Sequence, residues 1–152
     1  MIKGFEEYRK EGIVKKVSPD KERAKSLILD SERKMNVLER QLKALGIDKD
    51  LANEYILLCY DSLMLLVRAH MLIKGYNASG QGAHEAEIAY MRLLGADENE
   101  IRFTDQMRYF RNGMLYYGTA LDEEYAEKVI KFAKEACTRL RRTASRNGKA
   151  PK

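Results

Sequence analysis

Residues 55–73 read YILLCYDSLMLLVRAHMLI, an almost wholly apolar run. Its charged or titratable side chains are Asp61, Arg68 and His70, beside two tyrosines and a cysteine, and Gly75 follows as a natural helix stop. A helix that is apolar on nearly every side is typical of a protein core. A membrane span of about twenty residues is the alternative, but opposite charges near its centre and the lack of an aromatic belt disfavour it. We therefore predict a buried central helix.

The polar residues around this run follow a regular spacing. Glu54, Asp61, Arg68 and Gly75 are seven positions apart, so they share one narrow stripe of the helix. This stripe predicts an ion-pair seam or the wall of a site. His70 lies on the opposite, apolar side, where a hydrogen-bonded core histidine is favoured over a ligand.

Composition indicates one all-α domain in a reducing compartment. The chain has 152 residues with two Pro, seven Met, nine Tyr and 34% charged residues, and it lacks long Val/Ile/Thr alternation. Cys59 and Cys137 fall in different apolar-patterned helices, which favours buried free thiols over a disulfide or a metal site. The N-terminus is charged from Lys3 onward and has no signal-peptide pattern. We expect a cytoplasmic protein that neither spans nor binds a membrane.

Turn and cap signals divide the chain into an up-and-down bundle of about five helices over residues 18–143. A short arm, residues 1–17, precedes the bundle and packs on it, and a basic, disordered tail, residues 144–152, follows it. Ser18 is the expected N-cap of a helix ending near residue 45, and the central helix then runs to residue 74. The glycine-rich segment 75–82 is expected to be a turn. Three helices follow, over residues 83–94, from the Asp97–Glu100 capping box to 117, and after Asp122.

The net charge of +5 is concentrated at the C-terminal end. Residues 138–152 hold six of the 28 basic residues and no acidic one, so the remaining 22 nearly balance the 23 acidic residues. This segment is either an arm for phosphate groups or a short basic tail without a specific function.

The predicted helix over residues 98–117 carries the candidate chemistry. At about 100° per residue, its core face holds Phe103, Met107, Phe110, Met114 and Tyr117. The opposite, exposed arc holds Arg108, Tyr109, Arg111, Asn112 and Tyr116. Guanidinium groups bind phosphate and tyrosine rings stack on bases, so this arc suits a nucleic acid. A solvated helix face without a function is the alternative that the spacing leaves open.

The Arg111-Asn112 pair resembles the first half of the motif of the HEPN family (higher eukaryotes and prokaryotes nucleotide-binding), whose members are small helical bundles. In that motif an Arg is followed by Asn, His or Asp, and then by a His about five positions after the Arg. Residues 18–24, the Tyr60-Asp61-Ser62 run and His84 are also similar to the family. The resemblance covers most of residues 10–140. It implies an RNA-cleaving toxin or defence protein, of a kind often paired with a minimal nucleotidyltransferase.

The resemblance also implies a role for each motif residue. Arg111 holds the scissile phosphate, Asn112 orients it, and the motif histidine moves the proton of the ribose 2′-hydroxyl. That position is Tyr116 here, and a phenol is a poor general base at neutral pH. A metal-independent ribonuclease activity is therefore expected to be weak or lost, with binding of RNA or a nucleotide retained.

Further residues complete the predicted site. Arg108, Arg111, Tyr109 and Tyr117 are the binding residues, and Asp61, Arg68 and His84 support them. His84 is either a replacement for the missing base or a residue that only hydrogen-bonds at its helix start.

We expect no cofactor and no metal, because the two histidines are fourteen positions apart and only Glu87 lies at ligand spacing from His84. A homodimer is expected, with Tyr109 and Arg108 at its interface. The alternative function is a non-catalytic interaction module that pairs with a nucleotidyltransferase or another protein.

Overall fold

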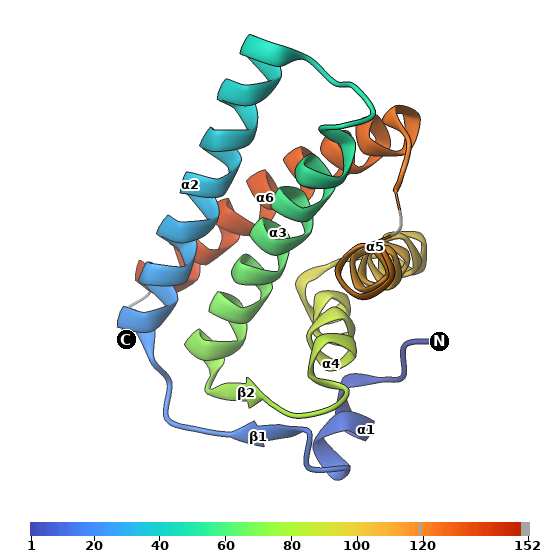
Figure 1. Cartoon of the computed structure of the whole chain (residues 1–152). Coiled ribbons are helices and arrows are strands. Elements are labelled where there is room, and N and C mark those ends of the chain that lie inside the picture. Colours follow the sequence, from blue (N-terminus) through green and yellow to red (C-terminus); the bar gives the residue numbers. More distant parts are fainter. Residues whose placement is uncertain (119, 150–152) are drawn as a thin grey trace.

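The computed structural model describes residues 1–118 and 120–149, and of Tyr116 and residues 147–149 it describes the backbone alone. Within these ranges the chain forms six α-helices, one 3₁₀ helix and a two-stranded sheet (Figure 1). In chain order the elements are α1 (Phe5–Lys10), β1 (Val14–Lys16), α2 (Lys21–Leu45), α3 (Ala52–Lys74), β2 (Tyr76–Ala78), α4 (Ala83–Tyr90), η1 (Met91–Leu94), α5 (Glu98–Tyr117) and α6 (Glu123–Lys149). The predicted all-α fold is confirmed as a mostly helical one, and the small sheet is an addition to it.

The central element is α3, as predicted. α2, α4, α5 and α6 all pack against it, and Tyr55, Tyr60 and Leu66 are each at most 1% exposed. In the described part of the chain α3 is the one helix long and apolar enough to cross a membrane, and 72% of its most apolar window is buried inside the protein. Contacts within the fold therefore account for its apolar composition.

The helices around α3 have two orientations. α2 and α3 lie side by side and antiparallel, with α6 behind them (Figure 1). α4 and α5 are seen almost end-on in the same view, so they cross α3 steeply. These two helices depart from the predicted up-and-down arrangement. Because they cross α3, each of these two helices meets the polar stripe over a short stretch, α5 at Asp61 and α4 at Arg68.

The N-terminal arm packs on the bundle, as predicted. Ile2, Phe5, Tyr8 and Val14 are buried in the main hydrophobic core. β1 pairs antiparallel with β2, so the prediction that segment 75–82 is only a turn between helices was wrong. Arg92 fixes the start of the arm, because its guanidinium donates to the carbonyl oxygens of Lys3 at 2.7 Å and Ile2 at 2.9 Å.

Most helix ends lie where the sequence predicted them. Asp97 and Glu100 form a complete capping box at the start of α5, and the carboxylate of Asp122 accepts from the backbone N–H of Tyr125 at the start of α6. The N-cap of α2 is Asp20 and not Ser18, because the Asp20 carboxylate accepts from the backbone N–H of Arg23 at 3.0 Å.

Two predictions about the C-terminal half need correction. Tyr117, assigned to the core face of α5, is 85% exposed, whereas Met107 on the same predicted face is fully buried. Residues 144–149, expected to belong to a disordered tail, continue α6 as far as Lys149. Residues 150–152 of that predicted tail lie outside the described residues.

Candidate functional site

The guanidinium of Arg111 reaches from α5 to the polar stripe of α3. Its Nε donates to the carboxylate of Asp61 at 3.1 Å, and its Cζ lies 5.6 Å from the centre of the Tyr60 ring, a cation–π distance. The Arg111 and Asp61 side chains are 25% and 37% exposed, so the pair lies at the protein surface without projecting freely from it. The predicted ion-pair stripe of α3 therefore faces α5 at Asp61.

Arg68, one heptad further along the stripe, is paired with α4. Its Nε and Nη2 donate to the two carboxylate oxygens of Glu87 at 2.7 and 3.0 Å, a bidentate arrangement. The Glu87 side chain is only 4% exposed. The hydrogen bond to Glu87 raises the pKa of Arg68 above its ordinary value. The two hydrogen bonds fix the Glu87 carboxylate in one position.

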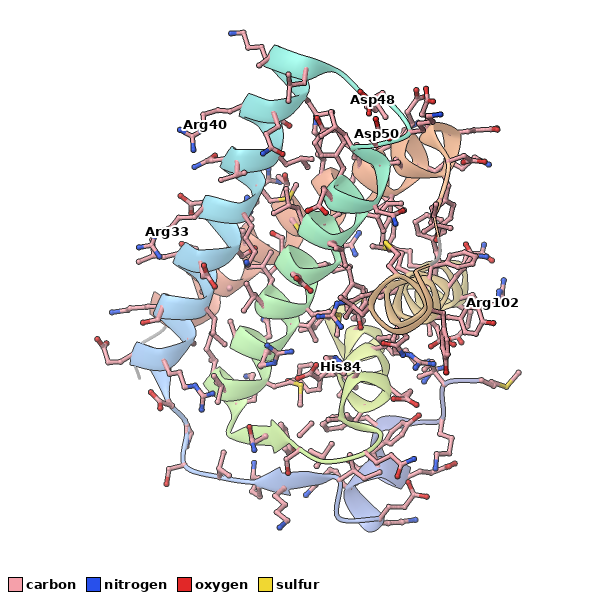
Figure 2. The ribbon with its side chains drawn as sticks, in the orientation of Figure 1. Arg33, Arg40, Asp48, Asp50, His84 and Arg102 are labelled. Carbon is pink, nitrogen blue, oxygen red and sulfur yellow. The ribbon has the colours of Figure 1, made fainter. Side chains whose placement is uncertain are left out.

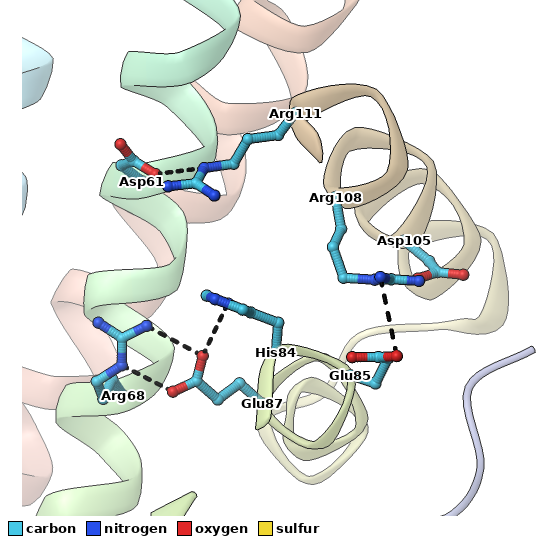
Figure 3. Close-up of polar contacts among 8 residues, drawn as sticks. All are labelled: Asp61, Arg68, His84, Glu85, Glu87, Asp105, Arg108 and Arg111. Atoms are coloured by element: carbon cyan, nitrogen blue, oxygen red, sulfur yellow. Dashed lines mark hydrogen bonds and ion pairs between the residues drawn. The ribbon is translucent and has the colours of Figure 1, made fainter. Parts of the chain in front are cut away.

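His84 lies beside this pair, in the first turn of α4. Its Nδ1 is 3.6 Å from Oε1 of Glu87, and its ring centre is 6.4 Å from that of Tyr60. Half of the side chain, 49%, is exposed to solvent. Figure 3 shows the imidazole projecting between the Asp61–Arg111 pair and the Arg68–Glu87 pair.

These side chains border one cleft among four helices, with a volume of about 260 Å³. Drug-sized ligands occupy pockets of about 300–1,000 Å³, so this cleft suits a smaller group such as a phosphate with part of a sugar. Its lining residues are Asp30 and Lys34 from α2, Tyr60, Asp61, Met64, Leu65 and Arg68 from α3, His84 from α4 and Arg111 from α5.

Opposite charges are mixed in this cleft. Lys34, Arg68 and Arg111 are its cations, and Asp30 and Asp61 are its carboxylates. Because Arg68 is already paired with Glu87, the cations left to attract an anion are Lys34 and Arg111. The arrangement favours an anionic group bound at a definite place over a broad electrostatic field.

Tyr60 lines the cleft and carries a fully buried, unused hydrogen-bond donor. The residue is 1% exposed, and its hydroxyl has no hydrogen-bond partner among the described residues. Burial raises the pKa of this phenol far above its ordinary value of 10.0. The hydroxyl therefore stays protonated, and a buried polar group of this kind is normally satisfied by a partner. An oxygen of a bound ligand is a chemically suitable partner.

The structure brings four of the predicted site residues together and separates others from them. Asp61, Arg68, His84 and Arg111 line the same cleft. Arg108 points away from it, toward α4, where it contacts the carboxylates of Asp105 at 2.8 Å and Glu85 at 3.8 Å (Figure 3).

The predicted exposed arc on α5 was wrong for its two arginines. The Arg108 and Arg111 side chains are only 22% and 25% exposed, because each is paired with acidic residues. Tyr109 and Tyr117 are exposed, at 70% and 85%, and neither lines the cleft. Asn112 is half-buried and is also absent from the cleft lining. Tyr116 belongs to α5, and its side chain lies outside the part of the chain that the structure describes.

Three polar residues that line the cleft, Tyr60, Asp30 and Lys34, were not predicted as site residues, and neither was Glu87, which pairs with Arg68. Tyr60 precedes Asp61 directly, and Glu87 follows His84 by three positions, so both adjoin predicted residues in the sequence. Asp30 and Lys34 are four apart, which places them on one face of α2. The acid and base at that spacing are also typical of an ordinary solvated helix, so the sequence carried no signal that this face meets the stripe of α3.

A larger groove lies elsewhere, between α2 and the C-terminal part of α6. Its volume is about 620 Å³, and Ile28, Leu29 and Ile73 contribute to its mainly apolar lining. Its charged lining residues, Lys21, Lys25, Glu32 and Arg141, include no histidine and none of the predicted site residues. We therefore take the cleft at Arg111 as the candidate site.

Metal and thiol chemistry have little support in the described residues. No group of three or more His, Cys, Asp or Glu side chains is positioned there to hold a metal ion. Cys59 and Cys137 are free and buried, as predicted, and burial raises the pKa of both thiols. A raised pKa disfavours the reactive thiolate form.

Comparison of the chain with known proteins finds no matching family model, no matching curated protein and no matching solved structure.

Proposed function

We propose that this protein binds RNA or a nucleotide through a phosphate group held at Arg111, as a HEPN-like protein with weak or lost ribonuclease activity. The observation that carries this proposal is the incomplete pairing of Arg111. Only its Nε donates to Asp61, so the two terminal nitrogens have no hydrogen-bond partner among the described residues. Arg68, by contrast, uses two of its nitrogens on Glu87. A guanidinium with free terminal N–H groups at the edge of a cleft is suited to a phosphate.

Tyr60 and Lys34 support the same ligand. The Tyr60 hydroxyl is a donor without a partner among the described residues, and Lys34 adds a positive charge from α2. A phosphate has enough acceptor oxygens to satisfy several donors together. Because Asp61 and Asp30 oppose an anion in this cleft, we expect modest affinity that falls as salt concentration rises.

The resemblance to the HEPN family agrees with this location. The Arg111-Asn112 pair lies on a helix that crosses the Asp61–Arg68 stripe of the central helix, and the fold is mostly helical. The chain departs from the family motif at Tyr116, which stands in place of the motif histidine. A phenol is a poor general base, so the residues of α5 alone are expected to support weak RNA cleavage or none.

Binding of a fluorescein-labelled single-stranded oligoribonucleotide, followed by fluorescence anisotropy, tests the proposal. Replacing Arg111 by Ala removes a charge-assisted hydrogen-bond donor worth about 1.5–3 kcal/mol, so we expect the affinity to fall by about 10-fold or more. Arg102→Ala is the matched control, because Arg102 lies on the same helix, projects away from α3 and is exposed (Figure 2). Equal affinities of the wild type and Arg111→Ala would remove the proposal.

A second candidate function is protein interaction, including pairing with another copy of the chain or with a nucleotidyltransferase-type partner. The exposed tyrosines of α5, Tyr109 at 70% and Tyr117 at 85%, favour it, since tyrosine is enriched at protein interfaces. Sedimentation velocity of the wild type and of Tyr109→Ser tests the homodimer. A concentration-dependent dimer that the substitution weakens is the expected result, and a monomer at all concentrations would contradict it.

A further inference from the structure

We propose that His84 of α4 is the catalytic base of this cleft, taking the proton of a ribose 2′-hydroxyl in place of the motif histidine that α5 lacks. This inference rests on the proposed binding of an RNA phosphate at Arg111. The structure contributes what the sequence did not show, namely that His84 and Arg111 line one cleft although they belong to different helices.

Glu87 orients the imidazole of His84. A carboxylate accepts hydrogen bonds, so the Glu87 oxygen that lies 3.6 Å from Nδ1 favours the tautomer with the proton on Nδ1. Nε2 then carries the lone pair that a general base requires. The 3.6 Å separation is longer than a full hydrogen bond, as is common for catalytic contacts before substrate binds.

The carboxylate that orients His84 is itself fixed. Glu87 is buried and held by two hydrogen bonds from Arg68, so it cannot turn away from the imidazole without breaking a bidentate pair. A base, a carboxylate that orients it and a third group that anchors the carboxylate form the arrangement typical of histidine catalysis. His84 remains 49% exposed, so its other nitrogen is accessible to a substrate.

Tyr60 lies next to both His84 and Arg111. The Tyr60 ring contacts both His84 and Arg111, with its centre 6.4 Å from the imidazole centre and 5.6 Å from the guanidinium carbon. A phosphate at Arg111 therefore shares this cleft with His84. The terminal nitrogens of Arg111 are donors for the charge that develops on the phosphoryl oxygens.

The reaction needs only RNA and water. His84 Nε2 accepts the 2′-hydroxyl proton while the 2′-oxygen attacks the adjacent phosphorus; the O2′–P bond forms and the P–O5′ bond breaks. The leaving 5′-oxygen takes a proton from water, and His84 returns its proton to the resulting hydroxide. The products are a 2′,3′-cyclic phosphate and a 5′-hydroxyl, with no oxidation, reduction or metal ion in the balance.

The test separates binding from cleavage. Affinity is measured with an oligoribonucleotide whose 2′-hydroxyls are methylated, and single-turnover formation of 2′,3′-cyclic phosphate is measured with the unmodified oligonucleotide. For His84→Ala we expect a cleavage rate lower by about 100-fold or more, an affinity within about 2-fold of the wild type, and partial recovery of the rate with added imidazole. Glu85→Ala is the matched control, because Glu85 is next to His84 on α4 and contacts Arg108 outside the cleft.

Two outcomes would overturn the inference while leaving the proposed function intact. One is RNA binding that depends on Arg111 with no cyclic phosphate formed by the wild type. The other is cleavage at the same rate in the wild type and in His84→Ala. If instead Arg111→Ala leaves binding unchanged, the proposed function falls, and the role of His84 falls with it. Circular dichroism and thermal unfolding of each variant separate these results from loss of the fold.

Discussion

At the scale of single residues, His70 is the clearest case of a polar group that the core accommodates. It is 2% exposed, and its Nε2 lies 2.9 Å from the carbonyl oxygen of Leu140. Because a carbonyl only accepts, Nε2 carries the proton in this contact. The hydrogen bond joins α3 to α6 and confirms the prediction of a hydrogen-bonded core histidine.

His70 makes the stability of the protein depend on pH. Burial, with a smaller effect from Lys74, lowers the pKa of His70 below its ordinary value of 6.5 against the opposing effect of the Leu140 carbonyl. The unfolded chain therefore takes up a proton before the folded protein does, so the free energy of unfolding falls as pH drops through 6.5 toward the folded pKa.

His70→Gln keeps an N–H donor for Leu140 and does not titrate. Urea unfolding of the wild type and of this variant between about pH 8 and 5 should show a steeper loss of stability in the wild type. Parallel stability profiles of the two proteins would contradict the prediction.

The sequence predicts the angular spacing of the arginine side chains around α5 but not the acidic residues with which they pair. The helical wheel placed Arg108 and Arg111 about 60° apart on one exposed arc. In the structure each finds a different acidic partner, Asp105 and Glu85 for Arg108 and Asp61 for Arg111. The partners on other helices depend on the tertiary arrangement, which periodicity along one helix does not specify.

At the scale of elements, two serines set how closely α2 and α3 approach. Ser31 and Ser62 are fully buried, their hydroxyl oxygens are 2.7 Å apart, and each hydroxyl oxygen lies within hydrogen-bond distance of the other residue's carbonyl oxygen, at 2.8 and 3.0 Å. Small side chains with satisfied hydroxyl groups allow this contact without a buried unpaired donor.

Replacing Ser31 by Leu should therefore separate the two helices. Overpacking of a core position costs about 1–3 kcal/mol, so we expect a corresponding loss in the free energy of unfolding, measured by urea denaturation. Ser26→Leu is the control, since Ser26 lies on the same helix and is exposed. Equal stabilities of the two variants would show that the contact between Ser31 and Ser62 does not restrict the helix spacing.

Gly75 fixes the passage from α3 to β2. Its φ is +83°, and a Cβ there would lie 2.6 Å from the carbonyl oxygen of Val17, whose backbone N–H donates to the Gly75 oxygen. Gly75→Ala should destabilise the protein more than Gly95→Ala, because Gly95 shares the left-handed conformation at φ +97° but has open space around it. Thermal unfolding of both variants measures the difference, and a larger loss for Gly95→Ala would contradict it.

Helix ends were more predictable than the sheet, for a physical reason. The Asp97–Glu100 capping box is a local feature, since both hydrogen bonds form within three residues. β2 has only three residues in a polar, glycine-containing segment, and its partner β1 is some sixty positions away. A strand this short has no periodic signal, so its pairing depends on the docking of the N-terminal arm.

At the scale of the whole molecule, the arm is part of the main core. Phe5 is 6% exposed and makes edge-to-face contacts with Tyr76 at 5.3 Å and Tyr90 at 4.9 Å between ring centres. The arm thereby holds β2 and α4, the element that carries His84, in their positions. Stability of the arm and geometry of the cleft are expected to be coupled.

Phe5→Ala should lower the free energy of unfolding of the entire protein. Truncation of a buried phenylalanine costs about 3–5 kcal/mol, and we expect one cooperative transition at lower urea concentration. Leu93→Ala serves as control, because Leu93 is 65% exposed. A separate early transition of the arm, with the midpoint of the main transition unchanged, would contradict its role in the core.

The cleft itself could be predicted from the sequence only in part. The heptad stripe on the central helix correctly indicated that Asp61 and Arg68 form ion pairs or line a site. The cleft residues that come from α2, α4 and α5 depend on how these helices pack against α3, including the steep crossing of α4 and α5. No local sequence pattern predicts this packing (Figure 1). Tyr60 was not predicted as a site residue, because in the sequence it is one more aromatic residue in an apolar run.

The most direct test of the account is an NMR titration that follows the Nε–H signals of the arginine side chains while a ribonucleoside monophosphate is added. The Arg111 signal, assigned from its loss in Arg111→Lys, should shift and saturate, because a phosphate would join Asp61 as its partner. The Arg92 signal, whose Nε donates to Glu98 far from the cleft, should stay unchanged. An Arg111 signal that does not move, while signals elsewhere in the protein do, would contradict the assignment of this cleft as the phosphate site.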